Sequence, residues 1–192
     1  MPNNLDTLSV IEALKIEVYS DSDFAACRDT RRSTTGFVIM LSGNLIAWCS
    51  SRQKCTTLST CEAEFVAGTD AIKLALFFRK VLHEMACAAK GDTESLRKDA
   101  SSQSYTVEWK SKHISGNIFL SMDNASAVQI TKTGDFRQKL KHISVRYHFL
   151  SDHARAGQVT VSHIAGIENP ADLFTKAVKP QVHASLINRI VA

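Results

Sequence analysis

The order in which strand and helix patterns follow one another limits the folds open to this chain more than any other feature of its sequence. Polarity alternates in LKIEVYSD (residues 14–21), and the apolar run FVIML, the pair Gly43-Asn44 and the run LIAWCS follow. Two-residue alternation is typical of strands, and a Gly-Asn pair between apolar runs indicates a hairpin turn. We therefore predict three antiparallel strands at the start of the chain, the third of which can continue into CTTL (residues 55–58).

A long helix is predicted next, from about Thr60 to Ala88. Ser59 and Glu62 have the spacing of a capping box, which satisfies free amides at the start of a helix. Apolar or small residues then recur at helical spacing, at Phe65, Gly68, Ile72, Ala75, Phe78, Leu82 and Met85. Residues 88–115 are polar with little periodicity, and we expect a long loop or partly disordered insertion there.

The second half of the chain alternates between shorter strand and helix patterns. A strand is expected at NIFLSM, a short helix at NASAVQITK that ends near Gly134, a second long helix over residues 135–157, and a fifth strand at QVTVSHI. Asn169 and Pro170 have the types expected at the cap and first position of a further helix. Pro180 interrupts that helix, and residues 181–192 form a terminal helix or tail.

This order predicts one α/β domain with a mixed five-stranded sheet, three antiparallel strands followed by two parallel ones, flanked by helices. The expected organisation is an N-terminal extension (1–14), the domain itself (15–180, with the insertion at about 88–115) and the C-terminal segment (181–192).

Composition excludes several classes of protein. No apolar run approaches the ~18 residues of a membrane span, and the N-terminus lacks the basic start and apolar block of a signal peptide. The five cysteines form no C-x-x-C pair, so we expect reduced intracellular thiols and neither a disulfide framework nor a zinc site. From Ser115 onward there are nine basic and five acidic residues, which accounts for the whole net charge of +4 and permits a polyanionic partner without demanding one.

Four acidic residues stand at the ends of predicted elements. Asp21 ends the first strand, Glu64 lies early in the long helix, Asp123 follows the fourth strand, and Asp172 lies in the first turn after Asn169. If strands one and four are neighbours, their aspartates meet at the edge where ligand crevices form in α/β sheets. Four gathered carboxylates repel one another, and oxygen ligands of this kind suit Mg²⁺ or Mn²⁺. The sequence therefore permits a two-ion site for phosphodiester hydrolysis.

Other interpretations of these acids remain open at this point. An acid at a strand end is commonly just solvated, and the helix dipole favours Asp172 whatever its function. Glu62 is explained by capping and is left out of the site. The sequence DSD also matches the D-x-D metal motif of glycosyltransferases, but no sugar-nucleotide domain of the usual size is visible, and the pattern of calcium-binding loops fails at Ala25 and Cys27.

Five blocks of the sequence are recognisable together. They are YSDSDFAACRDTRRSTTGFVIML, IAWCSSRQKCTTLSTCEAEFVAGTDAIKLALFFRKVLHEM, IFLSMDNASAV, KLKHISVRYHFLSDHARAGQV and NPADLFTKAV. In this order they resemble the ribonuclease H domain of the Pol polyprotein of copia-type (Pseudoviridae) LTR retrotransposons, over roughly residues 16–179.

The resemblance implies a ribonuclease H-like fold and an endoribonuclease that cleaves the RNA strand of RNA/DNA hybrids during reverse transcription. It places the acidic tetrad on Asp21, Glu64, Asp123 and Asp172, which would bind two Mg²⁺ ions (Mn²⁺ is possible). Implied partners are the RNA/DNA hybrid and the reverse transcriptase polymerase domain of the same polyprotein, with no membrane. The implied setting is a cytoplasmic virus-like particle, or the nucleus. His163 precedes the last acid, but we assign it no catalytic role.

Candidate nucleic-acid contacts are polar or basic residues near these acids. They are Arg31, Arg32, Ser33, Thr34, Arg52, Lys54, Asn124, Lys141, His142, Arg146 and His148. Each of them can equally be an ordinary solvated surface residue. The duplex would be read by shape, phosphates and 2′-hydroxyls and not by base sequence.

Two functional hypotheses follow from the sequence. The first is an active ribonuclease H, which the presence of all four acids favours. The second is an inactive or domesticated ribonuclease H-like module that binds nucleic acid or protein. The chain lacks the Y-x-D-D polymerase signature, a protease and an integrase, so we expect an excised or stand-alone fragment.

Overall fold

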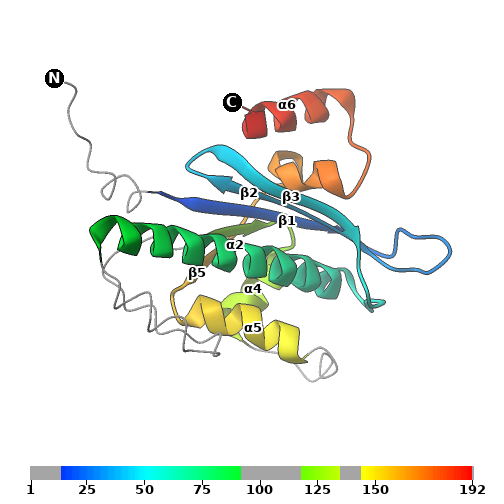
Figure 1. Ribbon diagram of the computed structural model, residues 1–192. Helices are drawn as coiled ribbons and strands as arrows, with labels where there is room; N and C mark the ends of the chain where they lie inside the picture. Colours follow the sequence, from blue (N-terminus) through cyan, green and yellow to red (C-terminus); the bar gives the residue numbers. More distant parts are fainter. Residues whose placement is uncertain (1–13, 92–117, 135–143, 192) are drawn as a thin grey trace.

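Five strands form one mixed sheet in the order β3-β2-β1-β4-β5 (Figure 1). This computed structural model describes residues 14–91, 118–134 and 144–191. The strands are β1 (Ile16–Asp23), β2 (Thr34–Leu41), β3 (Asn44–Arg52), β4 (Ile118–Met122) and β5 (Val159–His163). β1, β2 and β3 pair antiparallel, whereas β1–β4 and β4–β5 pair parallel. The predicted α/β fold is confirmed, with β1 and β4 as central neighbours.

Helices cover the sheet on both faces (Figure 1). One face packs against α2 (Thr60–Lys90), with α4 (Ala125–Thr133) and α5 (Ser144–Arg155) on the same side. The opposite face carries the short 3₁₀ helix η3 (Pro170–Phe174) and α6 (Pro180–Val191), which lie over β2 and β3. A second 3₁₀ turn, η2 (Gly166–Glu168), precedes η3. Most of the predicted insertion, the N-terminal extension and residues 135–143 lie outside the described residues.

The main core fills the space between the sheet and α2. Its buried residues include Val18, Ile39, Phe65, Ile72 and Leu120. A smaller cluster on the other face joins β2 to α6. The stripe predicted on α2 is wrong at Met85, whose side chain is 54% exposed. After Leu82, the next residue on the buried face of the helix is Ala86, four positions later. Met85 therefore lies on the side of the helix that faces solvent.

The loops around β3 differ in two places from the sequence prediction. Ser42 and Gly43 both have positive φ (48° and 85°), so they form the turn and Asn44 already belongs to β3. This is the backbone of the primed hairpin turns, whose twist matches that of the strands. The extension of the third strand into CTTL is wrong, because β3 ends at Arg52. Gln53 turns the chain toward α2, since its side-chain amide donates to Thr35 Oγ1 and to Ala63 O, both at 3.0 Å.

The capping residues predicted from the sequence lie at the ends of the observed helices, with one exception in helix type. Ser59 accepts a hydrogen bond from the Glu62 amide (3.2 Å), and Glu62 accepts one in return from the Leu58 amide (2.6 Å). Asn169 caps the segment that begins at Pro170 as predicted, but that segment is the 3₁₀ helix η3 and not an α-helix. Pro180 begins the terminal helix α6, where its missing amide costs nothing.

Gly36 of β2 lets η3 approach the sheet. It lies opposite Asp21 in the β1–β2 register. A Cβ atom added at this position would lie 2.5 Å from Thr175 Cγ2 and 2.8 Å from the carbonyl oxygen of Ala171. The close approach of the η3 segment to β2 therefore requires glycine here.

We expect Gly36→Ala to destabilise the fold by about 1–3 kcal/mol, the usual cost of overpacking a tight contact. Urea unfolding followed by circular dichroism measures this change. The double variant Gly36→Ala/Thr175→Ser removes the clashing methyl group and should recover part of the loss. Equal unfolding midpoints for Gly36→Ala and the unaltered chain would contradict the proposed close contact.

Candidate metal centre

Three acidic residues meet at the carboxyl ends of two central strands. Asp21 lies near the end of β1, and Asp123 directly follows β4, the parallel neighbour of β1. Glu64 reaches the same point from the first turns of α2. One carboxylate oxygen from each of Asp21, Glu64 and Asp123 lies within 4.8 Å of the other two. Parallel pairing thus brings together acids that are more than 100 positions apart in the sequence.

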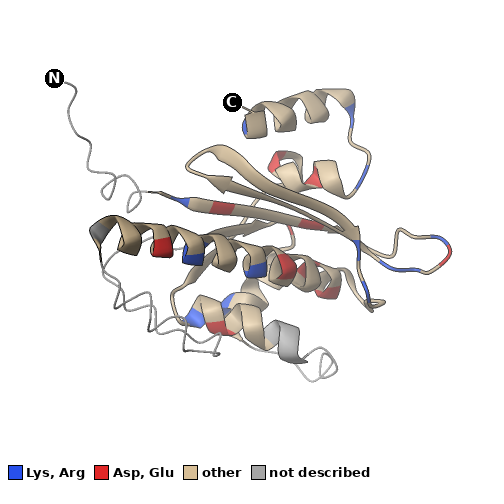
Figure 2. Ribbon diagram, viewed as in Figure 1, with Lys and Arg blue, Asp and Glu red and all other residues tan. Residues whose placement is uncertain are grey.

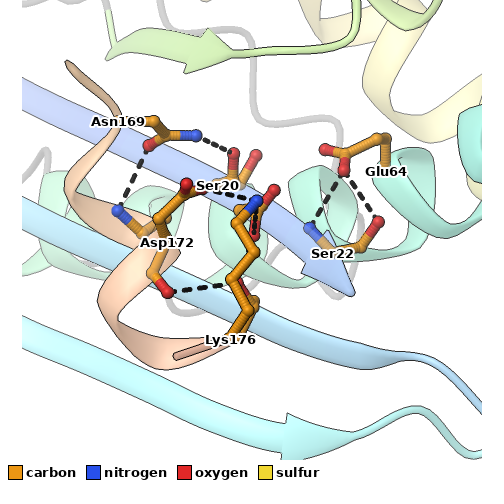
Figure 3. Close-up of polar contacts among 9 residues, drawn as sticks. Ser20, Ser22, Glu64, Asn169, Asp172 and Lys176 are labelled. Carbon is orange, nitrogen blue, oxygen red and sulfur yellow. Dashed lines mark hydrogen bonds and ion pairs between the residues drawn. The ribbon is translucent and has the colours of Figure 1, made fainter. Parts of the chain in front are cut away.

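The fourth acid, Asp172, joins this group through Lys176. The Lys176 ammonium lies 3.1 Å from Asp172 Oδ1 and 3.5 Å from Asp21 Oδ2 (Figure 3). Lys176 is absent from the candidates that the sequence yields. Its spacing of four residues after Asp172, which places two side chains on the same side of a helical turn, is the signal that could have indicated it.

Two side chains fasten the Asp172 segment to β1. Asn169 is fully buried, and its amide donates to the carbonyl oxygen of Ser20 (3.0 Å) while its Oδ1 accepts from the Ala171 amide (3.2 Å) (Figure 3). The Thr175 hydroxyl donates to Asp21 Oδ2. These contacts hold the segment that carries Asp172 directly against the strand that carries Asp21.

Glu64 is held by one oxygen and leaves the other free. Its Oε1 accepts hydrogen bonds from the Ser22 amide (2.9 Å) and the Ser22 hydroxyl (2.8 Å) (Figure 3). Its Oε2 is buried and has no hydrogen-bond partner among the described residues. A buried carboxylate oxygen without a partner is costly, and a cation would relieve that cost. The oxygen-only donor set fits a hard divalent ion such as Mg²⁺ or Mn²⁺.

Crowding of these carboxyl groups shifts their proton affinities. Burial, and then the charges of Asp21 and Asp123, raise the pKa of Glu64 to about 8 despite the hydrogen bonds from Ser22. Burial and the Asp21 charge also raise the pKa of Asp172 to about 6, against the opposing effect of Lys176. The pKa of Asp123 rises for the same two reasons. Without a cation, the site therefore relieves its repulsion by holding protons.

His163 ends β5 beside this group of acids. Its Nε2 lies 3.0 Å from the main-chain carbonyl oxygen of Asp123, and the side chain is exposed. The contact is with the backbone and not with the carboxylate, so it positions the Asp123 turn. No role was assigned to His163 from the sequence.

Most candidate nucleic-acid contacts near β1 to β3 are accessible. Arg31 and Arg32 are exposed in the loop between β1 and β2, whose basic character is visible in Figure 2. Thr34 begins β2 and pairs in register with Arg52 at the end of β3, and the exposed Lys54 follows. Arg28, in the same loop as Arg31, is also exposed; it is absent from the sequence candidates because it stands apart from the adjacent Arg31-Arg32 pair.

Ser33 differs from the other candidates because it is fully buried. Its hydroxyl accepts from the Ala25 amide (3.1 Å) and is 2.9 Å from Thr57 Oγ1. That hydroxyl therefore joins the β1–β2 loop to the loop before α2, and we remove Ser33 from the candidate contacts.

The remaining candidates lie on α4 and α5. Asn124 caps α4, since its Oδ1 accepts a hydrogen bond from the Ala127 amide (3.0 Å). Asn124 therefore has a structural role. His148 is exposed on α5. Lys141, His142 and the side chain of Arg146 lie outside the described residues.

The chain is similar to known proteins in both its sequence and its fold. No protein-family model matches the chain. It is 32% identical over 160 residues to the retrovirus-related Pol polyprotein from transposon TNT 1-94 of Nicotiana tabacum, which covers 83% of this chain and 10% of the polyprotein. It is 23% identical over 189 residues to the Pol polyprotein from transposon RE1 of Arabidopsis thaliana, which covers 98% of this chain and 11% of that protein. The chain thus spans about a tenth of the length of these curated relatives.

Among solved structures, the fold is similar to that of LC11-RNase H1, a protein isolated from compost by a metagenomic approach. The TM-score is 0.54 at 18% identity, over 84% of this chain and 92% of that one. The same protein in complex with an RNA/DNA hybrid gives a TM-score of 0.53 at 16% identity, over 84% and 94%. Identity this low shows the fold alone. Within the part of the chain that the structure describes, no helix is long and apolar enough to cross a membrane.

We expect the metal-free protein to lose stability through Glu64 as the pH rises. The pKa of Glu64 is about 8 in the folded chain and close to its ordinary 4.5 after unfolding, so between these values the folded state holds a proton that the unfolded state has released. This contribution to stability is therefore lost as the pH climbs from about 4.5 to about 8.

Melting temperatures of the unaltered chain and Glu64→Gln, measured in EDTA from pH 5 to pH 8, test this expectation. The neutral variant should be the more stable at pH 8 by a few degrees, and the difference should shrink toward pH 5. Glu84→Gln, which changes an exposed acid on the same helix, should show no such trend. A pH-independent difference for Glu64→Gln would contradict the raised pKa.

Proposed function

Because the homologues of this chain are retrovirus-related Pol polyproteins of copia-type transposons and its fold is that of ribonuclease H, we propose that it is a ribonuclease H domain. It acts as an endoribonuclease that hydrolyses the RNA strand of RNA/DNA hybrids during retrotransposon reverse transcription. The observation that carries the proposal is the meeting of Asp21, Glu64 and Asp123 within 4.8 Å at the carboxyl ends of β1 and β4, beside Asp172.

Each of the four acids has a role in this proposal. Asp21, Glu64 and Asp123 would hold one divalent ion, and Asp21 with Asp172 a second, with Mg²⁺ the expected metal and Mn²⁺ the alternative. When bound, such a pair activates a water molecule and stabilises the leaving oxygen of a phosphodiester, giving a 5′-phosphate and a 3′-hydroxyl.

Neighbouring side chains prepare these acids for that task. Ser22 fixes Glu64 through two hydrogen bonds and leaves Oε2 free to accept a further partner. Asn169 and Thr175 fix the Asp172 segment against β1. The chain therefore supplies an oxygen-lined site whose carboxylates are already oriented before any ligand arrives, which avoids the cost of ordering them.

The substrate would lie along the basic loop next to the acids. Arg31 and Arg32 lie in the β1–β2 loop just before β2, Arg52 is the last residue of β3, and Lys54 lies two residues further on. Thr34 pairs with both Asp23 and Arg52, so these basic residues lie at the same end of the sheet as Asp21. LC11-RNase H1, which shares the fold, has been solved in complex with an RNA/DNA hybrid. We further propose that the polymerase domain of a Pol polyprotein is the natural partner, in a virus-like particle or the nucleus.

Cleavage of a labelled RNA/DNA hybrid in Mg²⁺ tests the activity. The unaltered chain should cleave the RNA strand only, EDTA should abolish cleavage, and Asp123→Asn should reduce the rate at least about 100-fold, because it removes a proposed metal ligand. Asp152→Asn, at an exposed acid on α5, is the matched control and should keep full activity. Tight hybrid binding without cleavage by the unaltered chain would instead favour the inactive, nucleic-acid-binding module.

Hybrid binding should depend on the basic residues beside the β1–β2 loop. Arg32→Ala and Arg52→Ala should each weaken binding of a hybrid in Ca²⁺ and lower the dependence of log affinity on log salt by about one unit, as expected for one lost phosphate contact. Fluorescence anisotropy between low and moderate salt measures both quantities. Lys80→Ala, on the outer side of α2, should change neither. Unchanged salt dependence in both arginine variants would exclude this path for the duplex.

A further inference from the structure

The charges of the four acids are compensated unequally. Among the described residues, every ion pair formed by these acids involves Lys176, and its two partners are Asp21 and Asp172. Glu64 and Asp123 form no ion pair within the described part of the chain, and Glu64 Oε2 has no hydrogen-bond partner there. The Asp21–Asp172 side of the site is therefore paired directly with a cation of the chain, whereas Glu64 and Asp123 have no such direct pair among the described residues.

The attachment of Lys176 keeps its ammonium group near the acids while leaving it free to depart. Its backbone amide donates to the carbonyl oxygen of Asp172 (3.2 Å), so the base of the side chain is fixed one turn away from that acid. The side chain itself is 40% exposed, whereas those of Asp21 and Asp172 are 2% and 8% exposed. The ammonium can therefore move into water without any change in the backbone.

On this geometry, and resting on the proposed function above, we propose that Lys176 is a tethered counterion that occupies the Asp21–Asp172 side of the site before metal binds. A divalent ion held by Asp21 and Asp172 would have to displace the ammonium, because the ammonium already contacts one oxygen of each carboxylate. On the side formed by Asp21, Glu64 and Asp123, Lys176 pairs with Asp21 alone, and Glu64 and Asp123 form no ion pair among the described residues. The two sides then differ in affinity, and the Glu64 side fills first.

Removal of the Lys176 charge should lower the stability of the metal-free protein and raise the affinity of the Asp172 side for metal. The metal-free protein loses the cation that pairs with Asp21 and Asp172 in the described part of the chain, so it should melt at a lower temperature. A divalent ion no longer has to displace a bound cation or approach a positive charge, so its affinity for the Asp172 side should rise by at least about tenfold. Loss of a merely structural lysine would lower stability without raising metal affinity.

Titration with Mn²⁺ in the absence of nucleic acid tests the proposal on the full chain. Electron paramagnetic resonance of free Mn²⁺ gives the number of bound ions and their dissociation constants without reference to activity. We expect the unaltered chain to bind one ion well and a second weakly, and Lys176→Met to bind the second at least about tenfold more tightly. Lys176→Arg keeps the charge and should retain weak second binding. Lys179→Met, at an exposed lysine three residues further on, should match the unaltered chain.

An equal or lower second-ion affinity in Lys176→Met would overturn the proposal, as would a single identical ion bound by all four proteins. Should Lys176→Met not fold in EDTA, stepwise chelation of the Mn²⁺-loaded protein gives the same constants, with the same expected tenfold difference. Hybrid cleavage by the unaltered chain is scored separately. Unchanged Mn²⁺ binding in an active enzyme therefore refutes the counterion alone, whereas altered binding in an inactive protein refutes the nuclease function alone.

Discussion

The parallel pairing of β1 with β4 is the constraint on which the rest of this structure depends. The register Ser20↔Met122 places Asp21 and Asp123 next to each other immediately beyond the last paired residues. Since both strands run the same way, their following acids cannot separate without breaking the centre of the sheet. Repulsion between them is therefore built into the fold. Thr175 reduces it by a hydrogen bond to Asp21 and Lys176 by a positive charge beside Asp21, while Ser22 hydrogen-bonds the third acid, Glu64.

The same repulsion connects stability with chemistry. A buried group of acids can lower its energy by taking up protons or by binding cations, and the raised pKa of Glu64, about 8, shows the first solution in the metal-free chain. Protons and divalent ions then compete for the same oxygens. Repulsion between the carboxylates destabilises the metal-free state, and a bound cation removes that repulsion. Mutations that reduce the repulsion in the metal-free state therefore also weaken metal binding.

The sequence was informative where a local pattern decides the outcome. Asp21 and Asp123 each end an alternating or apolar run, and the capping hydrogen bonds of Ser59 and Asn169 involve near neighbours in the sequence. The sequence was uninformative where the position of a side chain depends on contacts with residues far away in the chain. Ser33 lies in a polar stretch typical of an exposed loop, yet Thr57 covers it. Lys176 could be linked to Asp172 by spacing, but not to Asp21, which meets it only through the folded sheet.

The fourth acid is attached differently from the other three, and this difference shapes what the site can do. Asp21, Glu64 and Asp123 come from β1, the start of α2 and the end of β4, which share the main core. Asp172 comes from η3 on the opposite face. The Asn169 side chain and the absence of a side chain at Gly36 set the distance of η3 from β1. Arg189 of α6 also donates a hydrogen bond to the Glu168 carbonyl oxygen, just before η3 (2.7 Å). Three of the acids are thus positioned by the main core, whereas the position of the fourth depends on a few polar contacts and on the terminal helix. Displacement of α6 would therefore act on Asp172 before the other three acids, because Arg189 of α6 contacts the turn that leads into η3.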